Sequence, residues 1–584
     1  MKRLPIVFTV LSVWLITLWQ QVFRADGWLI AEHAVMALLL HTIFFSVVQG
    51  WLKSQRVKAL VIALYAAVWT TFYQLIFLSA KFWGDIITLK IVITYLKSFA
   101  DFIQSLPVAP AQAIFFLAAP PLLVAIGTYR LLKSRQTTTA GTSTWLLIVA
   151  VVVLVAVKRP LHRVGEPMMV FLFDKMWGWN NNPFFTLEKN KAGKADEAAY
   201  RQYLSVKQSC AKRNVILIVC DGLRADHTTP YGYTRNTTPF LQELIREKKA
   251  VAVEQVIASG ASTVIGVPSL LLSRYWGGCS PYGFNLIKLL HAQGFQTHVL
   301  VSGAHRDWYN LAAFYQNDCD SYFDGKDSKK YYFKDDRVLE EGLAQVSVNR
   351  NQPQFFYFHI QSPHETALLR KDFEVYQPSK TSLIGNRDFT ALKNAYDNKV
   401  LQADETIRQL FATLAQKGIL QNALVVITAD HGQGLGEHGV AGHVDWLYQP
   451  QVRVPLLIVD TGLAFYQNTQ FARQIDIAPT LVNRLGLAVP ATWQGQPLSL
   501  QPPPDVAFME TGSSGLEHGH SPLQAVIERS DSAMFKLIAG GGNEVLYEVK
   551  TDRDEQFPRQ QQDTAVLHRL RNLLKRYIRG ENLK

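Results

Sequence analysis

The sequence contains few cysteines and few charged residues for its length. Four cysteines among 584 residues, none of them in a C-x-x-C pair, exclude a disulfide-rich scaffold, a zinc finger and a thioredoxin-type redox site. Only 18% of the residues are charged and 48% are hydrophobic, which fits neither a disordered chain nor a uniformly soluble enzyme. The chain is also too long for one ordinary domain, so we expect two or more.

The hydrophobic residues are concentrated in the first 160 positions. Five stretches there are long enough for a membrane-spanning helix, which needs about 20 residues. The basic start Met1-Lys2-Arg3 would also fit a signal peptide, but no small-x-small cleavage site follows it. The sequence therefore predicts a bundle of about five transmembrane helices within residues 1–160, at positions 4–20, 29–51, 59–78, 109–132 and 141–157.

Basic residues outnumber acidic ones by 59 to 47, and the net charge of +12 raises the question of a nucleic-acid partner. Much of the excess lies at the C-terminus and in clusters beside the apolar stretches, which favours a membrane protein without a nucleic-acid partner. These clusters precede the first stretch and lie between the second and third and between the fourth and fifth. By the positive-inside rule the N-terminus is cytoplasmic, and residues after about 160 lie on the periplasmic or extracytoplasmic side of a cell (inner) membrane.

From residue 214 onward, short β-branched runs alternate with segments of helical periodicity. Strand-length runs that are apolar throughout, separated by helices, predict a mostly parallel sheet covered on both faces. In such α/β sheets ligands bind beyond the carboxyl ends of the strands. The predicted strands cover residues 215–219, 297–301, 355–360, 424–428 and 456–459.

The last part of the chain differs in pattern from the sheet region. A proline-rich segment at 501–504 is typical of a linker, and the runs 525–538 and 544–550 predict strands of a small antiparallel subdomain. Residues 564–579 form a basic amphipathic pattern, for a helix that packs on its own domain or touches anionic lipid. We expect four regions: transmembrane residues 1–160, a linker at 161–211, a catalytic domain at 212–500 and a C-terminal subdomain at 501–584.

Carboxylates and imidazoles follow three of the predicted strands. Asp221 comes after the strand at 215–219, Asp430 and His431 after that at 424–428, and His364 after that at 355–360. One such residue is usually a helix cap or a satisfied polar group. Three strand ends at one edge of a sheet instead predict one or two divalent metal ions. Oxygen and nitrogen donors favour Zn²⁺, with Mn²⁺ as the alternative.

A hydroxyl-rich segment, 259–263, leads into the helical pattern 264–275. The unpaired N–H groups and positive dipole end of a helix start favour a bound phosphate or sulfate. Ser262 or Thr263 could simply cap the helix. A hydroxyl beside a metal ion, however, loses its proton more easily and can act as a nucleophile.

This set of motifs resembles the sulfatase branch of the alkaline-phosphatase superfamily, across roughly residues 212–500. The resemblance implies a mixed, mostly parallel sheet sandwiched by helices. A multi-span anchor with an external domain is similar to the phosphoethanolamine transferases that modify lipid A and to lipoteichoic-acid synthases. The matching features are the Asp221 turn with Tyr231-Gly232, the segment 263–274, Asp430-His431-Gly432 with the run 436–439, and the run 476–480.

The resemblance also implies roles for single residues. Asp221, Asp430 and His431 fall on metal-binding positions, and Thr263 falls on the threonine that both binds the metal and acts as the catalytic nucleophile. His364 and His443 fall on histidines that hold the substrate phosphate or a second metal. Together these residues form the predicted reaction centre.

Several residues depart from the family patterns. The run 263–267 has neither the Cys or Ser nor the Arg of the sulfatase motif, and Gly222 stands where sulfatases commonly have a second Asp. Both losses favour phospho-transfer over sulfate-ester hydrolysis. Relative to the transferases, Asp221 replaces a Glu, and Ser259 and Ser269 replace cysteines, which leaves the donor headgroup open.

We therefore expect a membrane-anchored, metal-dependent enzyme that transfers a phospho-headgroup, phosphoethanolamine or phosphoglycerol, through a phospho-threonine intermediate. The donor would be a phospholipid and the acceptor a lipid or glycan. Two alternatives are a sulfuric- or phosphoric-ester hydrolase of the same family and a catalytically inactive lipid sensor. The oligomeric state is left open, as is whether Cys279 and Cys319 form a disulfide.

Overall fold

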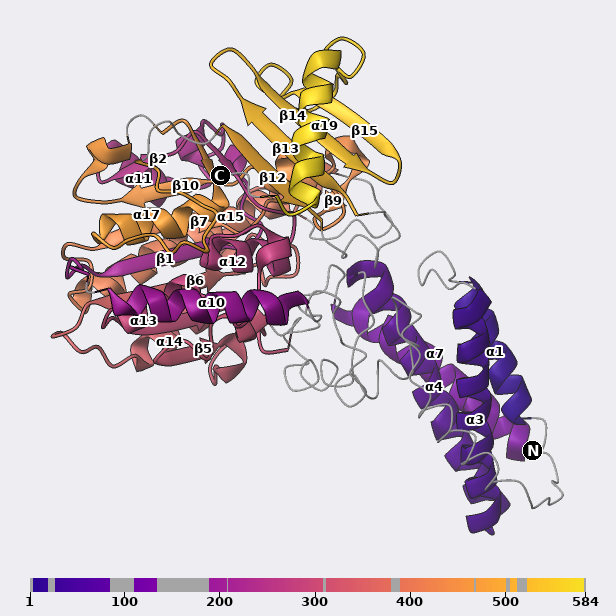
Figure 1. The fold of residues 1–584 in the computed structure, drawn as a ribbon. Coiled ribbons are helices and arrows are strands. Elements are labelled where there is room, and N and C mark those ends of the chain that lie inside the picture. The colour runs from indigo at the N-terminus through magenta and orange to yellow at the C-terminus, as the bar shows by residue number, and fades with distance from the viewer. Residues whose placement is uncertain are drawn as a thin grey trace. The chain divides into compact units, whose positions relative to one another are not determined.

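A computed structural model describes the chain as two compact units, one of residues 1–181 with 516–519 and one of residues 182–515 with 520–584 (Figure 1). Each unit is described by itself. The structure describes residues 4–18, 27–83, 110–133, 188–206, 208–307, 311–379, 389–466, 469–499, 505–511 and 522–581.

The described residues of the first unit form four long helices, α1 (Leu4–Leu18), α3 (Gly27–Trp51), α4 (Gln55–Trp83) and α7 (Pro110–Lys133). They coincide with four of the five predicted spans, and the fifth, 141–157, lies outside the described residues. Among the described helices, two segments are long and apolar enough to cross a membrane, His33–Trp51 and Gln55–Ile76. The bundle of five spans therefore stays a prediction.

The helices of the first unit pack through a mixed apolar and polar interior. Phe8, Phe45 and Ile62 are buried in one cluster. Two imidazole–phenol hydrogen bonds cross from α3 to α4, each of 2.6 Å: His33 Nε2 with the hydroxyl of Tyr73, and His41 Nδ1 with that of Tyr65. Large apolar side chains are exposed on the outside of these helices. They include Val10, Leu38, Leu60, Leu64, Val68, Leu122 and Leu123.

The second unit is built around a seven-stranded sheet of order β2-β10-β7-β1-β6-β4-β5. The central strands β7, β1, β6, β4 and β5 run parallel, whereas β10 is antiparallel to both β7 and β2. The sheet is thus mixed and mostly parallel, and all five predicted strands are in it. Its strands are β1 (Val215–Cys220), β2 (Ala250–Ala252), β4 (Gln296–Val301), β5 (Ser321–Asp324), β6 (Gln354–Ile360), β7 (Leu424–Ala429) and β10 (Leu456–Val459).

Helices pack around this sheet in two groups. One group has α15 (Phe389–Gln416) in contact with α11 (Pro239–Arg246) and α14 (Arg337–Gln345). In the other, α12 (Thr263–Leu272) contacts α13 (Leu286–Ala292) and α17 (Ile477–Arg484). Strand β4 contacts both α13 and α14, so a helix of each group covers it. Smaller elements are β3 (Gln255–Ile257), β8 (Gly434–Leu435), β9 (Ala441–Gly442), α16 (Gln449–Val452) and β11 (Phe471–Arg473).

A four-stranded antiparallel sheet follows, as predicted, with the order β12-β13-β14-β15. The predicted strand at 525–538 is two strands, because a turn closed by Ser530 N–H and Ala533 O (2.8 Å) interrupts it. The proline-rich segment 501–504 lies outside the described residues. The strands are β12 (Val506–Glu510), β13 (Gln524–Arg529), β14 (Met534–Gly540) and β15 (Asn543–Glu548).

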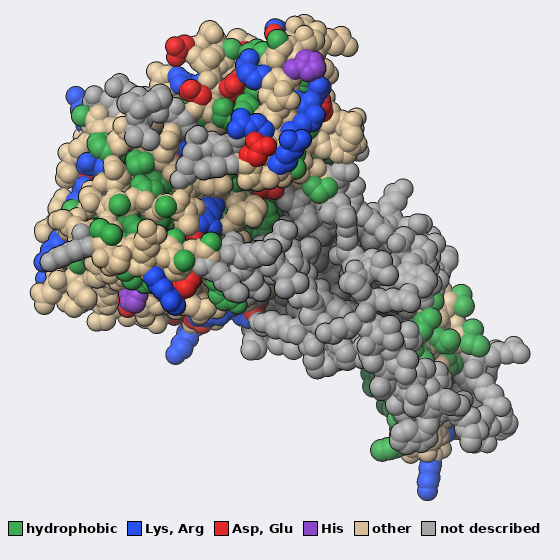
Figure 2. Space-filling model, viewed as in Figure 1, with side chains coloured by type: hydrophobic (Ala, Val, Ile, Leu, Met, Phe, Trp, Pro, Cys, Tyr) green, Lys and Arg blue, Asp and Glu red, His purple; other side chains and the backbone are tan. Residues whose placement is uncertain are grey.

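The C-terminal helix α19 (Thr564–Ile578) packs on this sheet. Its leucines 567, 570 and 574 are buried against Val526 and Leu537 in one apolar cluster. Figure 2 shows Lys and Arg side chains, interspersed with acidic ones, over the outward side of this helix. Arg569 and Arg571 donate to Glu528 and Glu544 of the sheet, each at 3.0 Å. Of the two expectations for this helix, packing on its own domain is therefore the one observed.

Part of the predicted linker also belongs to the second unit. Residues Glu188–Ser205 form helix α10, and the guanidinium of Arg274 binds both carboxylate oxygens of Asp196, one of them at 3.0 Å from Nη1. The Tyr203 hydroxyl donates to Ala488 O at 2.8 Å. All four cysteines are free thiols, so Cys279 and Cys319 are not bridged.

Candidate active site

The predicted site residues lie at the carboxyl ends of three adjacent strands. Cys220, the last residue of β1, is in register with Ile360 at the end of β6 and with Ala429 at the end of β7. Asp221 and Asp430 therefore begin neighbouring loops, and His364 lies in the loop after β6. The parallel sheet is what brings residues that are more than 200 positions apart in the chain to one edge.

Asp221, Asp430 and a third residue, His359, form a candidate metal site in which one ligand atom from each lies within 4.8 Å of the others. The sequence reasoning missed His359, because it treated 355–360 as a uniformly apolar strand. In register, His359 stands beside Val219 and Val301. The feature of the sequence that could have revealed His359 is a single imidazole one residue before the end of an otherwise apolar run.

The polar atoms of this cluster are buried without hydrogen-bond partners. Asp221 Oδ1, His359 Nε2 and Asp430 Oδ2 all have this property, and the three residues are at most 5% exposed. Leaving such atoms unsatisfied costs roughly 1–3 kcal/mol each, more when the group is charged. A divalent cation would satisfy all three at once, and carboxylate oxygens with an imidazole nitrogen are donors that Zn²⁺ and Mn²⁺ accept. The residues therefore fit a divalent metal.

His431 lies against this cluster. Its Nε2 is 3.3 Å from Asp221 Oδ1 and 3.7 Å from Asp430 Oδ2, and its Nδ1 donates to Gly432 O at 2.7 Å. Burial alone would lower the pKa of His431, but Asp430 and Asp221 outweigh it and raise the pKa to about 9. The carboxylates thus create a strongly negative site that favours a cation.

The two carboxylates respond differently to the same surroundings. Burial raises the pKa of Asp221, yet the nearby imidazoles of His364, His359 and His431 outweigh it and hold the pKa well below its ordinary value. Burial raises the pKa of Asp430, and the charge of Asp221 adds to this effect. Asp221 is therefore the more firmly ionised of the pair.

Thr263 is the first residue of α12, and its hydroxyl points into the site. Thr263 Oγ1 lies 3.2 Å from His431 Nε2. The capping alternative finds no support at the preceding residue, because Ser262 makes no side-chain cap hydrogen bond and its Oγ is buried without a partner. The threonine hydroxyl is thus placed beside the candidate metal site.

A glycine allows α12 to approach this site closely. A Cβ atom at Gly266 would lie 2.2 Å from the backbone oxygen of Asp430. No side chain fits in that gap, so Gly266 lets the first turn of the helix rest on the end of β7. This contact fixes the position of Thr263 relative to Asp430 and His431.

His364 and His443 complete the group. The ring of His443 stacks on that of His431 with centroids 4.4 Å apart, and the His364 ring lies 4.9 Å from His443. His364 Nδ1 accepts from the backbone N–H of Thr366 at 3.1 Å, so the proton of the neutral ring is on Nε2. Burial lowers the pKa of His364, which favours this neutral form. The structure therefore brings all six predicted residues together: Asp221, Thr263, His364, Asp430, His431 and His443.

Residues 213–487 match the family model described as Sulfatase. This region is a sulfatase-family domain. Phosphatidylethanolamine transferase Mcr-2 of Escherichia coli is 24% identical over 330 residues, 53% of this chain and 60% of that protein. Lipoteichoic acid synthase-like YvgJ of Bacillus subtilis (strain 168) is 24% identical over 321 residues, half of each chain. The chain spans about half the length, or less, of the curated relatives it matches first.

Two solved structures resemble part of the chain. A structure of BT4656 in complex with its substrate D-glucosamine-2-N,6-O-disulfate has a TM-score of 0.52 at 16% identity, covering 64% of this chain and 97% of that one. The soluble domain of lipooligosaccharide phosphoethanolamine transferase A from Neisseria meningitidis has a TM-score of 0.42 at 18% identity, covering 49% and 90%. The first likeness supports the alkaline-phosphatase-like α/β fold of the domain.

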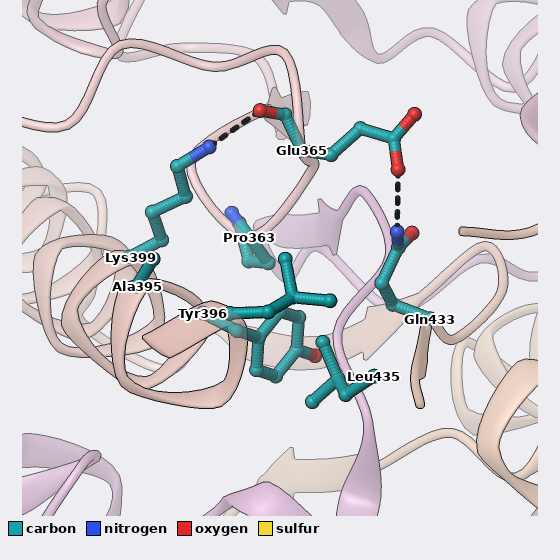
Figure 3. Close-up of a pocket in the computed structure, with 8 residues that line it drawn as sticks. Pro363, Glu365, Ala395, Tyr396, Lys399, Gln433 and Leu435 are labelled. Carbon is teal, nitrogen blue, oxygen red and sulfur yellow. Dashed lines mark hydrogen bonds between the residues drawn. The ribbon is translucent and has the colours of Figure 1, made fainter. Parts of the chain in front are cut away.

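Beside the reaction centre, the sulfatase-family domain contains a small pocket (Figure 3). Gln433 connects the two, because its Oε1 accepts from His443 Nδ1 at 3.0 Å while its Nε2 donates to Glu365 Oε2 at 2.7 Å. Lys399 donates to the backbone oxygens of His364 (3.0 Å) and Glu365 (2.7 Å). The sequence reasoning named none of these three side chains, because none belongs to a motif with a recognisable spacing.

Proposed function

We propose that the protein is a membrane-anchored, metal-dependent phosphotransferase that moves a phospho-headgroup from a phospholipid to a lipid or glycan acceptor. The observation that carries the proposal is the Thr263 hydroxyl, 3.2 Å from His431 and beside a cluster of unpartnered metal-binding atoms. The relative Mcr-2, named as a phosphatidylethanolamine transferase, supports a phospholipid donor. The sulfatase motif's missing Cys and Arg support phospho-transfer over sulfate hydrolysis.

Asp221, His359, Asp430 and His431 are the proposed ligands of a divalent cation, with Zn²⁺ ahead of Mn²⁺ on their mixed nitrogen and oxygen donors. A bound ion would lower the pKa of the neighbouring Thr263 hydroxyl, whose proton would pass to solvent, and would stabilise negative charge on the phosphoryl oxygens. Thr263 itself contributes the oxygen that attacks phosphorus.

The chain's own residues bind and orient the reacting groups. Thr263 Oγ forms a bond to phosphorus while the bond from phosphorus to the diacylglycerol oxygen breaks. That oxygen takes up a proton from solvent, and the neutral His364 stabilises it by a hydrogen bond from Nε2–H. His443 donates from Nδ1 to Gln433, which leaves Nε2 to act as an acceptor. In the second half, the acceptor hydroxyl gives its proton to His443, its oxygen bonds to phosphorus, and the bond to Thr263 Oγ breaks.

The first unit is proposed as the anchor in a multi-pass inner-membrane protein, with the sulfatase-family domain outside the cytoplasm. Its exposed apolar side chains and two candidate spans support this placement. An anchor of this kind keeps the reaction centre near lipid headgroups. With water as the acceptor, the same residues would instead hydrolyse a phosphate or sulfate ester.

The test is to supply vesicles of headgroup-labelled phospholipids to the purified full-length protein and look for label on Thr263 by peptide mass spectrometry. Thr263→Ala should abolish the label, whereas Ser262→Ala, which removes a neighbouring hydroxyl, should retain it. Label that persists at this peptide in Thr263→Ala would refute the nucleophile. Turnover of a soluble aryl phosphate or sulfate with water, without any transfer product, would favour hydrolysis.

A further inference from the structure

A carboxylate lies beside the two imidazoles that flank the reaction centre. Glu365 directly follows His364, and its Oε2 accepts the 2.7 Å hydrogen bond from Gln433 Nε2. The other end of the same amide, Gln433 Oε1, accepts from His443 Nδ1 at 3.0 Å. One amide group therefore separates the carboxylate of Glu365 from His443, and one peptide bond separates the residue from His364.

Among the described residues, this carboxylate forms no salt bridge, although Lys399 and His364 lie close enough to interact with it electrostatically. Lys399 is the basic side chain that lines the same pocket, but it donates to the backbone oxygens of His364 and Glu365 (Figure 3). Within the residues that the structure describes, Glu365 has no recorded ion pair, and its one recorded side-chain hydrogen bond is that from Gln433. The half-buried carboxylate thus has capacity for a further, positively charged partner.

The space next to Glu365 is kept open by a glycine. A Cβ atom at Gly442 would lie 3.5 Å from Glu365 Oε2, which places the carboxylate against the loop that carries His443. Gly442 has a φ of +94°, a conformation that side-chain-bearing residues rarely adopt. On the side of His443, therefore, no side chain of residue 442 stands against the carboxylate.

A site that binds a phosphate and has a carboxylate at its edge is complementary to a ligand with both a negative and a positive charge. An ethanolamine headgroup has an ammonium group a short carbon chain away from its phosphate, so it can bind both parts. A glycerol headgroup has only neutral hydroxyls in that place. It would leave the half-buried carboxylate without this additional charge-assisted hydrogen bond.

We propose that Glu365 is a specificity-determining residue that binds the ammonium group of the donor headgroup, so that the donor is an amine-bearing phospholipid. This inference rests on the proposed phospho-transfer. Gln433 bonds both Glu365 and His443, so the positions of these two side chains are coupled. The site would therefore bind the ammonium group and the phosphate of one headgroup at the same time. The expected contribution is about 10- to 100-fold in selectivity, the range of a charge-assisted hydrogen bond.

The first measurement is binding without turnover. Full-length protein with Thr263→Ala, loaded with Zn²⁺, is titrated calorimetrically with O-phosphoethanolamine and with glycerol 3-phosphate. Adding Glu365→Gln should weaken binding of phosphoethanolamine by about 10- to 100-fold and leave glycerol 3-phosphate nearly unchanged. Glu374→Gln, an exposed residue of the same loop region, is the matched control and should change neither. Equal loss for both ligands, or no loss for either, would overturn the proposal.

The second measurement is the ratio of Thr263 labelling from vesicles of phosphatidylethanolamine and of phosphatidylglycerol, each labelled in the headgroup. In the otherwise unchanged protein we expect phosphatidylethanolamine to dominate, and Glu365→Gln to reduce the ratio by a factor similar to that seen in binding. A ratio that Glu365→Gln leaves unchanged overturns the role of Glu365 alone. If neither lipid labels Thr263, the phospho-transfer is refuted. The binding measurement then decides the role of Glu365.

Discussion

His359 is the residue whose role depends most on its place in the sheet. It is fully buried, and its Nε2 has no hydrogen-bond partner but faces Asp221 Oδ2 at 3.6 Å. An imidazole kept in that state inside an apolar sheet is best explained as a metal ligand. His298, on the neighbouring strand, is buried to the same degree, but its two ring nitrogens bond Ser321 and Gln354.

We expect His359→Ala to lower bound metal from about one ion per chain toward none, because it removes one of the proposed ligands. The activity should fall with it. Metal content is measured by mass spectrometry after gel filtration, and folding by the thermal unfolding midpoint. His298→Ala serves as the control and should retain the metal. Full metal occupancy in a folded His359→Ala protein would contradict the assignment.

Lys399 is a buried amine whose charge depends on pH. Burial lowers its pKa to about 7, against an ordinary value of 10.5, although Glu365 acts in the opposite direction. A neutral amine has two N–H groups, and the backbone oxygens of His364 and Glu365 accept two hydrogen bonds from it. Both N–H donors of the neutral form are therefore satisfied in the folded protein.

Between pH 7 and about 10.5 the unfolded chain binds more protons at this lysine than the folded one, so stability should rise with pH across that window. Below pH 7 both forms are protonated, and the unfavourable burial of the charge is constant. Lys399→Met should remove this pH dependence. The measurement is the unfolding midpoint of both proteins against pH, and curves that stay parallel from pH 7 to 10 would contradict the lowered pKa.

At the scale of elements, α12 sets the distance between the proposed nucleophile, Thr263, and the strand ends. The helix begins at Thr263 and rests against Asp430 through Gly266, where a Cβ would lie 2.2 Å from a backbone oxygen. The contact involves the backbone of both segments, so neither can yield by a simple side-chain rotation. The position of the hydroxyl is thus a property of the helix packing.

Gly266→Ala should therefore push α12 away from β7 and cost about 1–3 kcal/mol of unfolding free energy, less any gain in helix propensity. Displacing a reacting group by about 1 Å can reduce the rate about 100-fold. We therefore expect a large loss of labelling in a protein that still folds. Labelling of Thr263 and the unfolding midpoint are the two measurements. Gly277→Ala, where no atom lies within 4 Å, is the control. Unchanged labelling in Gly266→Ala would show that the packing does not set the site.

Across the second unit, a buried ion pair connects the C-terminal sheet to the sulfatase-family domain. Lys536 on β14 and Glu555 have fully buried side chains, with Nζ and Oε1 2.8 Å apart. Glu555 Oε2 also accepts from the backbone N–H of Gln449, at the start of α16, at 2.6 Å. Helix α16 directly follows the loop that carries His443. By bonding the start of α16, Glu555 therefore fixes the end of that loop.

Lys536→Met leaves Glu555 buried without its cation and should destabilise the protein by about 3–5 kcal/mol. The double variant Lys536→Met with Glu555→Gln removes the charge yet keeps an acceptor for Gln449, and it should recover most of the loss. Unfolding in denaturant measures both. If the single and the double variant lose the same stability, the ion pair is not the cause.

Local sequence patterns reveal some parts of the fold and of the candidate site but not others. The five core strands and the residues that end them could be predicted, because an apolar run followed by Asp221 or by Asp430-His431 is a local signal. His359 could not, since a strand buried on both faces has no alternation that would mark one side chain as different. Glu365 and Gln433 meet only through the packing of loops, which no spacing in the sequence reveals.

The proposed chemistry requires a divalent cation held beside Thr263. The most direct test is an anomalous difference map, collected at the zinc and manganese edges from crystals of the full-length protein prepared with each metal. We predict a peak at a bonding distance of about 2.0–2.2 Å from Asp221, His359 and Asp430, next to the Thr263 hydroxyl. A metal-loaded crystal without a peak at these side chains, or with Thr263 turned away from it, would contradict the account.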